Sequence, residues 1–357
     1  MEVLNLKKDD GNPLFLGESL GLQEYTSPTY PQFEELALLQ RSQFWTETEI
    51  DMSKDAKQWK DLDKNTQDIS ILNLSWQIMA DSIVGRAPFT VIMPYITNPE
   101  FEGMMVQWGY FENLHSRAYS NMVRMTFPEP QEIINEVKIN DNAYGRLKII
   151  IDLFNKLGAK QSDYFSGNYN RKEMMRDLYH AIIAIYGLES MQFYCSFACT
   201  FALAEQDILN GFADNLKLIA KDEALHTRMS LEALKVLKSI PEWAELIAEE
   251  EDTTYSILSA IRNTEKDWGQ YLFSEGRQVM GLNAPLLNDY LDFSSANAFK
   301  AAGLTPNFEF PRSNPIPWID KYLNPSMVQV APQERQITNY RVGSSQGDLN
   351  DLDDFDF

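Results

Sequence analysis

The sequence predicts an all-α fold, and three observations support this. Alternating strand-like runs are almost absent, and several long stretches lack proline. Prolines and capping residues stand at the ends of those stretches, where helices begin or end. With 44% apolar and 12% aromatic residues, the chain can bury a large core and is too apolar for a disordered protein.

The expected helices follow in chain order. The first has a cap at Asn65-Thr66 and reaches about Arg86, before Pro88. The second covers 101–125, after the start signal Asn98-Pro99. Further helices are expected over 143–157, 172–210, 212–239, 254–278 and 285–302. The stretch 172–210 is long for one helix, so a kink or break is expected at its internal glycine, Gly187.

Charge and cysteine usage exclude several functions. The 31 Lys and Arg against 52 Asp and Glu give a net charge of −21, which argues against binding nucleic acid or an anionic membrane. Cys195 and Cys199 are expected to be reduced core thiols, so a secreted disulfide scaffold is excluded. The N-terminus lacks a signal peptide pattern, and the most apolar segment, 191–204, is judged too short and too polar to span a bilayer. A cytoplasmic protein is expected.

Three regions are expected: an N-terminal extension over 1–30, a helical domain over 31–325 and a flexible C-terminal tail over 326–357. The tail ends in an acidic segment that cannot bury enough apolar area to fold alone. Its apolar residues are typical of anchors for a partner's groove, and they are Leu349, Leu352, Phe355 and Phe357. The alternative is a plain solubilising tail, for which terminal aromatics are a poor choice.

Two of the three histidines stand in the same local pattern. Glu112 precedes His115 by three residues, and Glu223 precedes His226 by three. Residues at i and i+3 share one face of a helix, so each Glu-x-x-His can present a carboxylate and an imidazole to one point.

A carboxylate precedes each Glu-x-x-His within an apolar helix. Asp81 lies 31 residues before Glu112, and Glu189 lies 34 residues before Glu223. This repeat predicts a ferritin-like four-helix bundle, elaborated with additional helices, in which six ligands point inward. Two divalent cations would offset four buried carboxylates, and a set without thiolates suits iron or manganese. The alternative is solvated surface pairs, but Asp81 and Glu189 stand among apolar residues.

Neighbouring residues suggest what the metals do. Tyr119 is four residues after His115, so its phenol points toward the same site. Phe193, Phe197 and Ile219 lie on the helical faces of Glu189 and Glu223 and would form an apolar wall. Each could instead be an ordinary core residue, although a buried tyrosine hydroxyl needs a partner.

These motifs resemble the small, radical-generating subunit of class I ribonucleotide reductase, of the tyrosyl-radical di-iron type. The resemblance covers residues 33–340 and thins over 127–176. The motifs that show the resemblance are the segments 81–86, 112–119, 189–194, 196–199, 221–226 and 312–318.

The resemblance implies specific roles. Two iron ions in a di-iron-oxo centre, with manganese possible, would be bound by Asp81, Glu112, His115, Glu189, Glu223 and His226. Oxygen activation, with an electron donor, would oxidise Tyr119 to a stable radical inside an apolar pocket of Phe193, Phe197 and Ile219. An electron-transfer relay to the large subunit would use Trp45, Asp222 and Tyr340.

The resemblance also implies a homodimer, with the tail docking the large catalytic subunit that reduces ribonucleoside diphosphates, or triphosphates, to deoxyribonucleotides. Two other functions remain open from the residues. An oxygenase or desaturase of the same fold would need an open substrate channel, and it would not need Tyr119 or the acidic aromatic tail. Iron storage or a purely structural helical protein would fit the length and the tail poorly.

Overall fold

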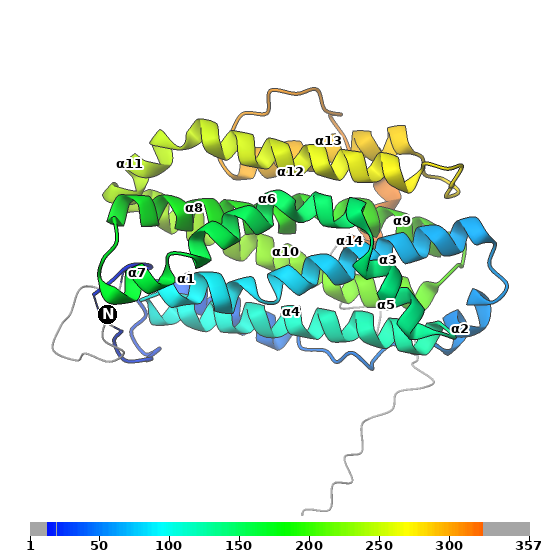
Figure 1. Ribbon diagram of the computed structural model, residues 1–357, viewed down its shortest axis with the longest axis horizontal. Coiled ribbons are helices and arrows are strands. Elements are labelled where there is room, and N and C mark those ends of the chain that lie inside the picture. The colour runs from blue at the N-terminus through cyan, green and yellow to red at the C-terminus, as the bar shows by residue number, and fades with distance from the viewer. Residues whose placement is uncertain (1–12, 19, 324–357) are drawn as a thin grey trace, which may run out of the picture.

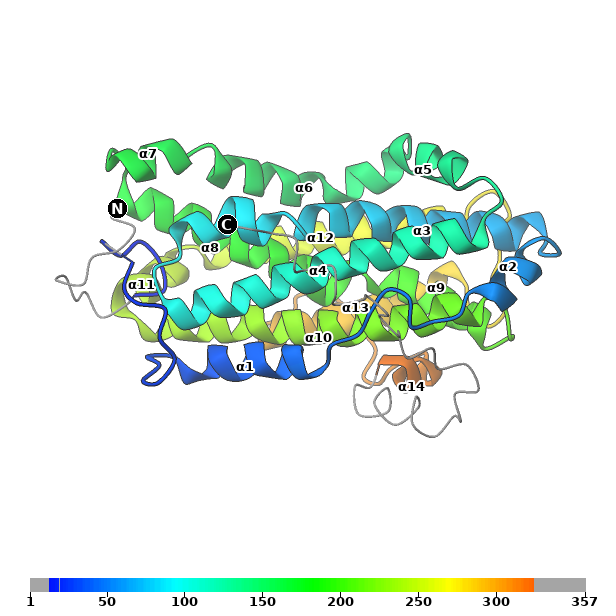
Figure 2. The same ribbon diagram turned by 90° about the horizontal axis from the view of Figure 1, so that it is seen from below.

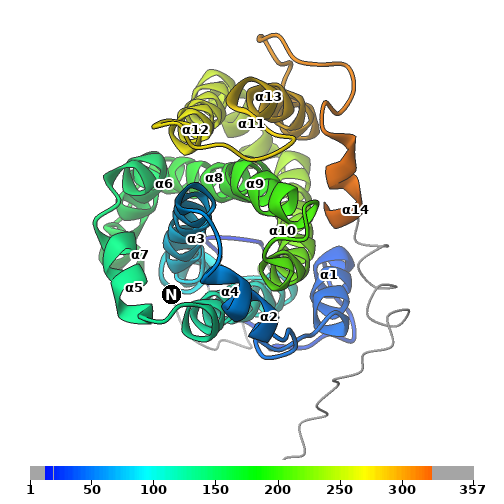
Figure 3. The same cartoon turned by 90° about the vertical axis from the view of Figure 1, so that its right-hand side faces the viewer.

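The computed structural model describes residues 13–18 and 20–323. In this part of the chain the regular secondary structure is helical, with isolated β-bridges but no strand. The all-α prediction is confirmed. Long rods run side by side through its centre: α3 (Lys64–Val84), α4 (Pro99–Thr126), α10 (Asn210–Ser239) and the pair α8 (Arg171–Gly187) and α9 (Tyr194–Ala204). Figure 3, which looks along these rods, shows them arranged around a common centre.

Polar caps set where several helices begin. Asn98 caps α4 by accepting from the Phe101 N–H at 2.8 Å, next to Pro99. The cap of α3 is Asp63, two residues before the predicted one, because its carboxylate accepts from both the backbone and the hydroxyl of Thr66. Asparagines cap α6 (Asp141–Gly158), α8 and α13 (Ala284–Ala301) in the same way, and they are Asn140, Asn170 and Asn283.

The interruption predicted near Gly187 is present. α8 ends at Gly187 and continues as a π-helical segment, η3 (Leu188–Gln192), before α9 starts. A Cβ atom at Gly187 would lie 2.5 Å from Ile261 Cδ1, so glycine allows α12 (Glu251–Leu272) to approach closely here. The π-helical turn carries Glu189, and π-turns of this kind often mark functional sites.

The apolar segment 191–204 is part of a longer helical rod. The stretch Arg171–Ala204 passes a length and composition test for a membrane-crossing helix, but 94% of the tested window is buried inside the protein. The helical rod is thus longer than the apolar segment 191–204 on which the prediction was made, because it begins at Arg171. Its burial against neighbouring helices identifies it as a core helix.

Shorter helices surround the rods (Figures 1 and 2). α1 (Pro31–Ser42) packs on α4 and α10, and α6 (Asp141–Gly158) contacts both α8 and α12. The others are α2 (Ser53–Trp59), α5 (Pro130–Lys138), α7 (Gln161–Ser166), α11 (Pro241–Glu249), α13 (Ala284–Ala301) and α14 (Asp320–Leu323), with π-helical η1 (Pro88–Ile92) and 3-10 turns η2 (Met93–Tyr95) and η4 (Pro317–Ile319).

Two helices end earlier than predicted. The rod expected over 172–210 ends at Ala204, the last residue of α9. α12 ends at Leu272 rather than 278, because Arg277 donates to the carbonyls of Leu272 and Tyr271 and Gly276 takes a positive φ of 79°. The structure also contains two short elements beyond the last predicted helix, η4 and α14. Tyr340 and the tail over 326–357 lie outside the described residues, as do residues 1–12 of the extension predicted over 1–30.

Candidate dinuclear metal centre

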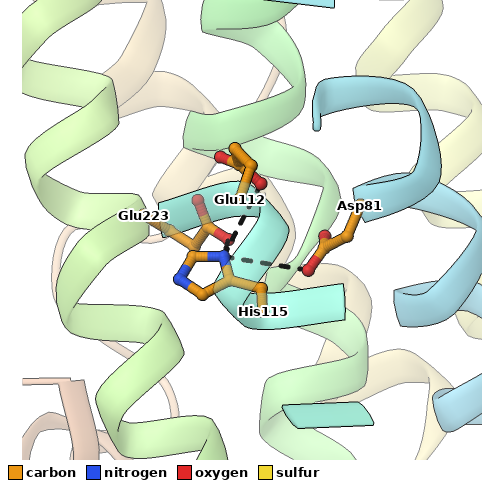
Figure 4. A group of neighbouring side chains, drawn as sticks. All are labelled: Asp81, Glu112, His115 and Glu223. Carbon is orange, nitrogen blue, oxygen red and sulfur yellow. Dashed lines mark ion pairs between the residues drawn. The ribbon is translucent and has the colours of Figure 1, made fainter. Parts of the chain in front are cut away.

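Six carboxylate and imidazole side chains converge between the rods. They come from four elements and all are buried: Asp81 from α3, Glu112 and His115 from α4, Glu189 from η3, and Glu223 and His226 from α10. The i, i+3 spacing places each Glu and His on one helix face, as predicted. Figure 4 shows Asp81, Glu112, His115 and Glu223 pointing toward one another from three helices.

One half of the cluster is centred on His115. Its Nδ1 atom lies 3.2 Å from Glu223 Oε1, 3.6 Å from Glu112 Oε2 and 3.8 Å from Asp81 Oδ2. The ligand atoms of these four residues all lie within 4.8 Å of one another, close enough to hold one metal ion.

The other half is centred on His226. Its Nδ1 atom lies 2.8 Å from Glu112 Oε1 and 3.0 Å from Glu223 Oε2. With Glu189 these residues form a second group whose ligand atoms lie within 4.8 Å of one another. Glu112 and Glu223 belong to both groups, so they are placed to bridge two ions.

The cluster fits metal ions because several of its buried polar atoms lack a hydrogen-bond partner. Both oxygens of Asp81 and of Glu189 have no hydrogen-bond partner, and His115 Nδ1 has none either. Buried polar atoms of this kind are costly unless something binds them. Oxygen and imidazole donors without a thiolate suit iron or manganese.

The electrostatics of the cluster lead to the same conclusion. Burial and the charges of Glu112 and Glu223 raise the pKa of Asp81 well above its usual value. Burial and the same two glutamates also raise the pKa of Glu189. Burial opposes the charge on His226, but Glu112 and Glu223 raise its pKa to about 9. Without cations the cluster must hold protons instead, and divalent ions would offset the same negative charge.

The outer nitrogen of each imidazole has its own partner. His115 Nε2 lies 3.1 Å from Asp222 Oδ2, and the Trp45 indole N–H donates to that same oxygen at 2.8 Å. Such partners fix the orientation of metal-bound histidines. Trp45 is buried and lies outside the helices. The structure brings it into contact with Asp222, as the resemblance implies.

Two residues at the site were missed from the sequence. The side-chain amide of Gln40, on α1, lies 2.6 Å from His226 Nε2. Trp108 donates its indole N–H to Glu112 Oε1 at 3.0 Å and stacks on His226 with ring centroids 4.9 Å apart. Trp108 stands four residues before Glu112, a spacing that could have revealed it. No local spacing links Gln40 to His226.

Tyr119 is fully buried beside the cluster. Burial and the nearby Asp81 carboxylate raise the pKa of Tyr119 well above its ordinary value, so the phenol keeps its proton. No hydrogen bond of standard geometry is formed by its hydroxyl. Phe193, Phe197 and Ile219 are also buried, and the two phenylalanines stack at 5.6 Å. Their role as a pocket around Tyr119 stays a prediction.

Fold and site together define a ferritin-like helical protein whose core fits a metal site. The sequence model of the family "Ribonucleotide reductase, small chain" matches residues 23–315. The chain is 34% identical to the beta subunit of ribonucleoside-diphosphate reductase 1 from Escherichia coli O157:H7, over 96% of this chain and 95% of that protein. It is 32% identical to the corresponding beta subunit of Enterobacteria phage T4, over 98% and 95%.

Solved structures show the same fold. The ribonucleotide reductase R2 subunit from Clostridium botulinum superposes with a TM-score of 0.81 at 23% identity, over 90% of this chain and 97% of that one. The dimanganese(II)-NrdF of Streptococcus sanguinis gives a TM-score of 0.67 at 18% identity, over 84% and 98%. The chain belongs to the ribonucleotide reductase small-chain family. This confirms the predicted family, the ferritin-like fold and the assignment to an oxidoreductase.

Proposed function

We propose that this chain is the radical-generating small subunit of a class I ribonucleoside-diphosphate reductase, with Tyr119 as the radical site. The observation that carries the proposal is the convergence of six buried carboxylate and imidazole side chains, two of them carboxylates without any hydrogen-bond partner, beside a buried tyrosine. The relatives that act on diphosphates favour that substrate over a triphosphate.

The six residues Asp81, Glu112, His115, Glu189, Glu223 and His226 would hold two iron ions, and manganese would fit the same donors. When bound, the metal pair supplies the oxidising chemistry with O2 and a reductant. The protein's part is to fix the donors and to keep them dry. Trp108 contributes to this by holding Glu112 Oε1 and covering one face of His226.

Tyr119 supplies the oxidisable group. Its phenol is neutral, fully buried and close to Asp81, whose carboxylate can take up the phenolic proton. Burial excludes water and small reductants, which would otherwise quench an oxidised tyrosine. We propose that Phe193, Phe197 and Ile219 form the wall that keeps them out.

A hydrogen-bonded path links the cluster to Trp45. It runs from His115 Nε2 through Asp222 Oδ2 to the Trp45 indole, with separations of 3.1 and 2.8 Å. The Trp45 and His115 rings are also nearly parallel, with an 18° angle between their planes and centroids 6.0 Å apart. We propose that this path carries electrons, and that Tyr340 continues it toward the large subunit.

The proposed assembly is a cytoplasmic homodimer that binds the large subunit through the tail over 326–357. A homodimer surface is suggested by neighbouring exposed apolar side chains on and beside α4, which are Phe44, Phe89, Val106 and Tyr110. Phe44 stacks on Tyr110 at 6.3 Å, and Phe89 packs directly against Gly109. On a chain with a net charge of −21, an apolar cluster of this kind favours a protein partner.

Electron paramagnetic resonance tests the proposal. The protein is loaded anaerobically with ferrous iron, exposed to air and compared with Tyr119→Phe. We expect an organic radical coupled to a metal pair in the wild type, and none in the variant although it binds the same amount of iron. A silent wild-type spectrum at full iron loading would contradict the proposal and favour an oxygenase.

A further inference from the structure

A buried ion pair lies outside the bundle, against the rod that carries Glu189. Arg146, on α6, pairs with Glu265, on α12, and the two side chains are each 1% exposed. The Arg146 guanidinium also stacks over Trp76, 3.5 Å from the ring centroid, and contacts Trp268 at 4.9 Å. Buried ion pairs add little net stability over an apolar packing, so this pair needs another explanation.

Both members of the pair bind the backbone at the end of the π-helical segment. Arg146 donates to the Gln192 carbonyl, and the Cys195 N–H donates to Glu265 Oε1 at 3.1 Å. The Gln192 side chain returns the contact by donating to the Arg146 carbonyl and to Thr264 Oγ1, each at 3.1 Å. Residues from three elements are therefore tied together at this point.

The hydrogen-bond pattern of the helix explains why Arg146 and Glu265 bind the backbone at this point. A π-helical turn bonds i to i+5, whereas the α-helix that follows bonds i to i+4. Where the pattern changes, backbone groups lose their regular partners and must find others. Gln192 and Cys195 stand at this change, between η3 and the first turn of α9.

The direction of Glu189 depends on this backbone, because no residue outside the ligand cluster holds its carboxylate. Its two carboxylate oxygens have no hydrogen-bond partner, unlike Glu112, which Trp108 holds. Its direction is therefore set by the turn on which it stands. α12 also contacts the other end of that turn, where Ile261 and Leu258 approach Gly187.

We propose that Arg146 and Glu265 are positioning residues that lock the π-helical segment and so aim Glu189 at the second metal group. The inference rests on the proposed metal centre. It predicts a selective effect of removing the ion pair. The affinity for the ion held by Glu112, Glu189, Glu223 and His226 falls, and the affinity for the ion in the His115 group changes much less.

The test compares the full-length chain with the double variant Arg146→Met/Glu265→Leu, which removes both charges together. Metal-free protein is titrated with Mn²⁺, and free Mn²⁺ is followed by electron paramagnetic resonance. We expect the affinity for one of the two ions to fall about 10- to 100-fold, the usual effect of losing an outer support of a metal site. Amide exchange of metal-free protein should also become faster within residues 188–195.

Arg262→Met/Asp292→Leu is the matched control, because it removes an ion pair that joins α12 to α13 and forms no hydrogen bond or ion pair with η3 among the described residues. It also takes from Lys266 its partner Asp292, so it is at least as disruptive to α12 as the test variant. It should leave Mn²⁺ affinity and the exchange of 188–195 unchanged. Equal loss in both double variants, or no change in either, would overturn the proposal. If Arg146→Met/Glu265→Leu does not fold, Glu265→Gln serves instead, and unchanged exchange of 188–195 there would overturn it.

The metal centre itself is tested separately by the wild type. If wild-type protein binds no Mn²⁺ or Fe²⁺, the proposed function fails. Amide exchange of metal-free protein would still decide whether the ion pair locks the segment.

Discussion

His115 turns its two ring nitrogens toward different partners: Nδ1 faces the carboxylate cluster, and Nε2 lies 3.1 Å from Asp222 Oδ2. This arrangement frees Nδ1 to bind a metal while Asp222 holds the other side of the ring. On His226 the outer nitrogen instead meets the neutral amide of Gln40. The two halves of the site therefore differ in the charge of their outer support.

Asp222→Ala should weaken metal binding at the His115 group by about 10- to 100-fold, because the ring loses the acceptor that orients it. Trp45→Phe is the matched variant. It keeps the contact between His115 and Asp222, so metal affinity should be unchanged while turnover with the large subunit is lost. Mn²⁺ titration and nucleotide reduction assays measure the two effects. Equal metal affinities in both variants would refute the role of Asp222.

Gln40→Leu should lower the stability of the metal-free protein by about 1–3 kcal/mol, because it leaves His226 Nε2 buried without a partner. Gln43→Leu, at the end of the same helix, makes no contact with a histidine and should have a smaller effect. Urea unfolding of both variants gives the comparison. Similar losses would mean that the contact between Gln40 and His226 contributes nothing specific.

Gly187→Ala should destabilise the fold by about 1–3 kcal/mol through overpacking against Ile261 and Leu258. Adding Ile261→Val removes the closest atom and should recover part of the loss. Gly145→Ala is the control, since a Cβ there meets nothing within 4 Å, and it should stabilise α6 by about 0.5–1 kcal/mol. Chemical denaturation measures all three, and a neutral Gly187→Ala would contradict close packing at this point.

His180 should make stability fall under mildly acidic conditions. Burial lowers the pKa of His180 below its usual value, despite Glu250 Oε2 at 3.0 Å, with Arg176, Lys156 and Asp177 nearby. The unfolded chain thus takes up this proton at higher pH than the folded chain. The stability contributed by neutral His180 is complete at a pH above its pKa in the unfolded chain. This stability is lost as the pH falls from that pKa toward the lower pKa of His180 in the folded chain. His180→Gln should flatten the dependence of unfolding free energy between about pH 7 and 5, and an unchanged slope would refute this.

Deleting residues 348–357 should abolish activity with the large subunit but leave the Tyr119 radical intact. The expectation rests on the apolar residues within this acidic segment. Radical content and turnover are measured on the same preparation. Full turnover by the truncated chain would show that the docking site lies elsewhere.

The sequence was sufficient to bring the six clustered side chains together, because the helical period determines which face of a helix they share. The spacing of Glu112 and His115, repeated at Glu223 and His226, fixes two faces, and the apolar helices before them point to Asp81 and Glu189. Contacts between residues that are far apart in the chain produce no spacing pattern in the sequence. Gln40 reaches His226 across 186 positions, and Glu265 reaches Cys195 across 70. Gly187 indicated an interruption, but only the structure shows a π-helical turn there.

The most direct test of the account is the number and coupling of the metal ions in the wild-type chain. Anaerobic titration with Mn²⁺, followed by electron paramagnetic resonance of the bound ions, measures both. We predict that each chain binds two ions and that their spectrum is magnetically coupled. Asp81→Ala or Glu189→Ala should lower the affinity for Mn²⁺. A single ion, two uncoupled ions, or binding that survives both substitutions unchanged would contradict a shared centre built from these six residues.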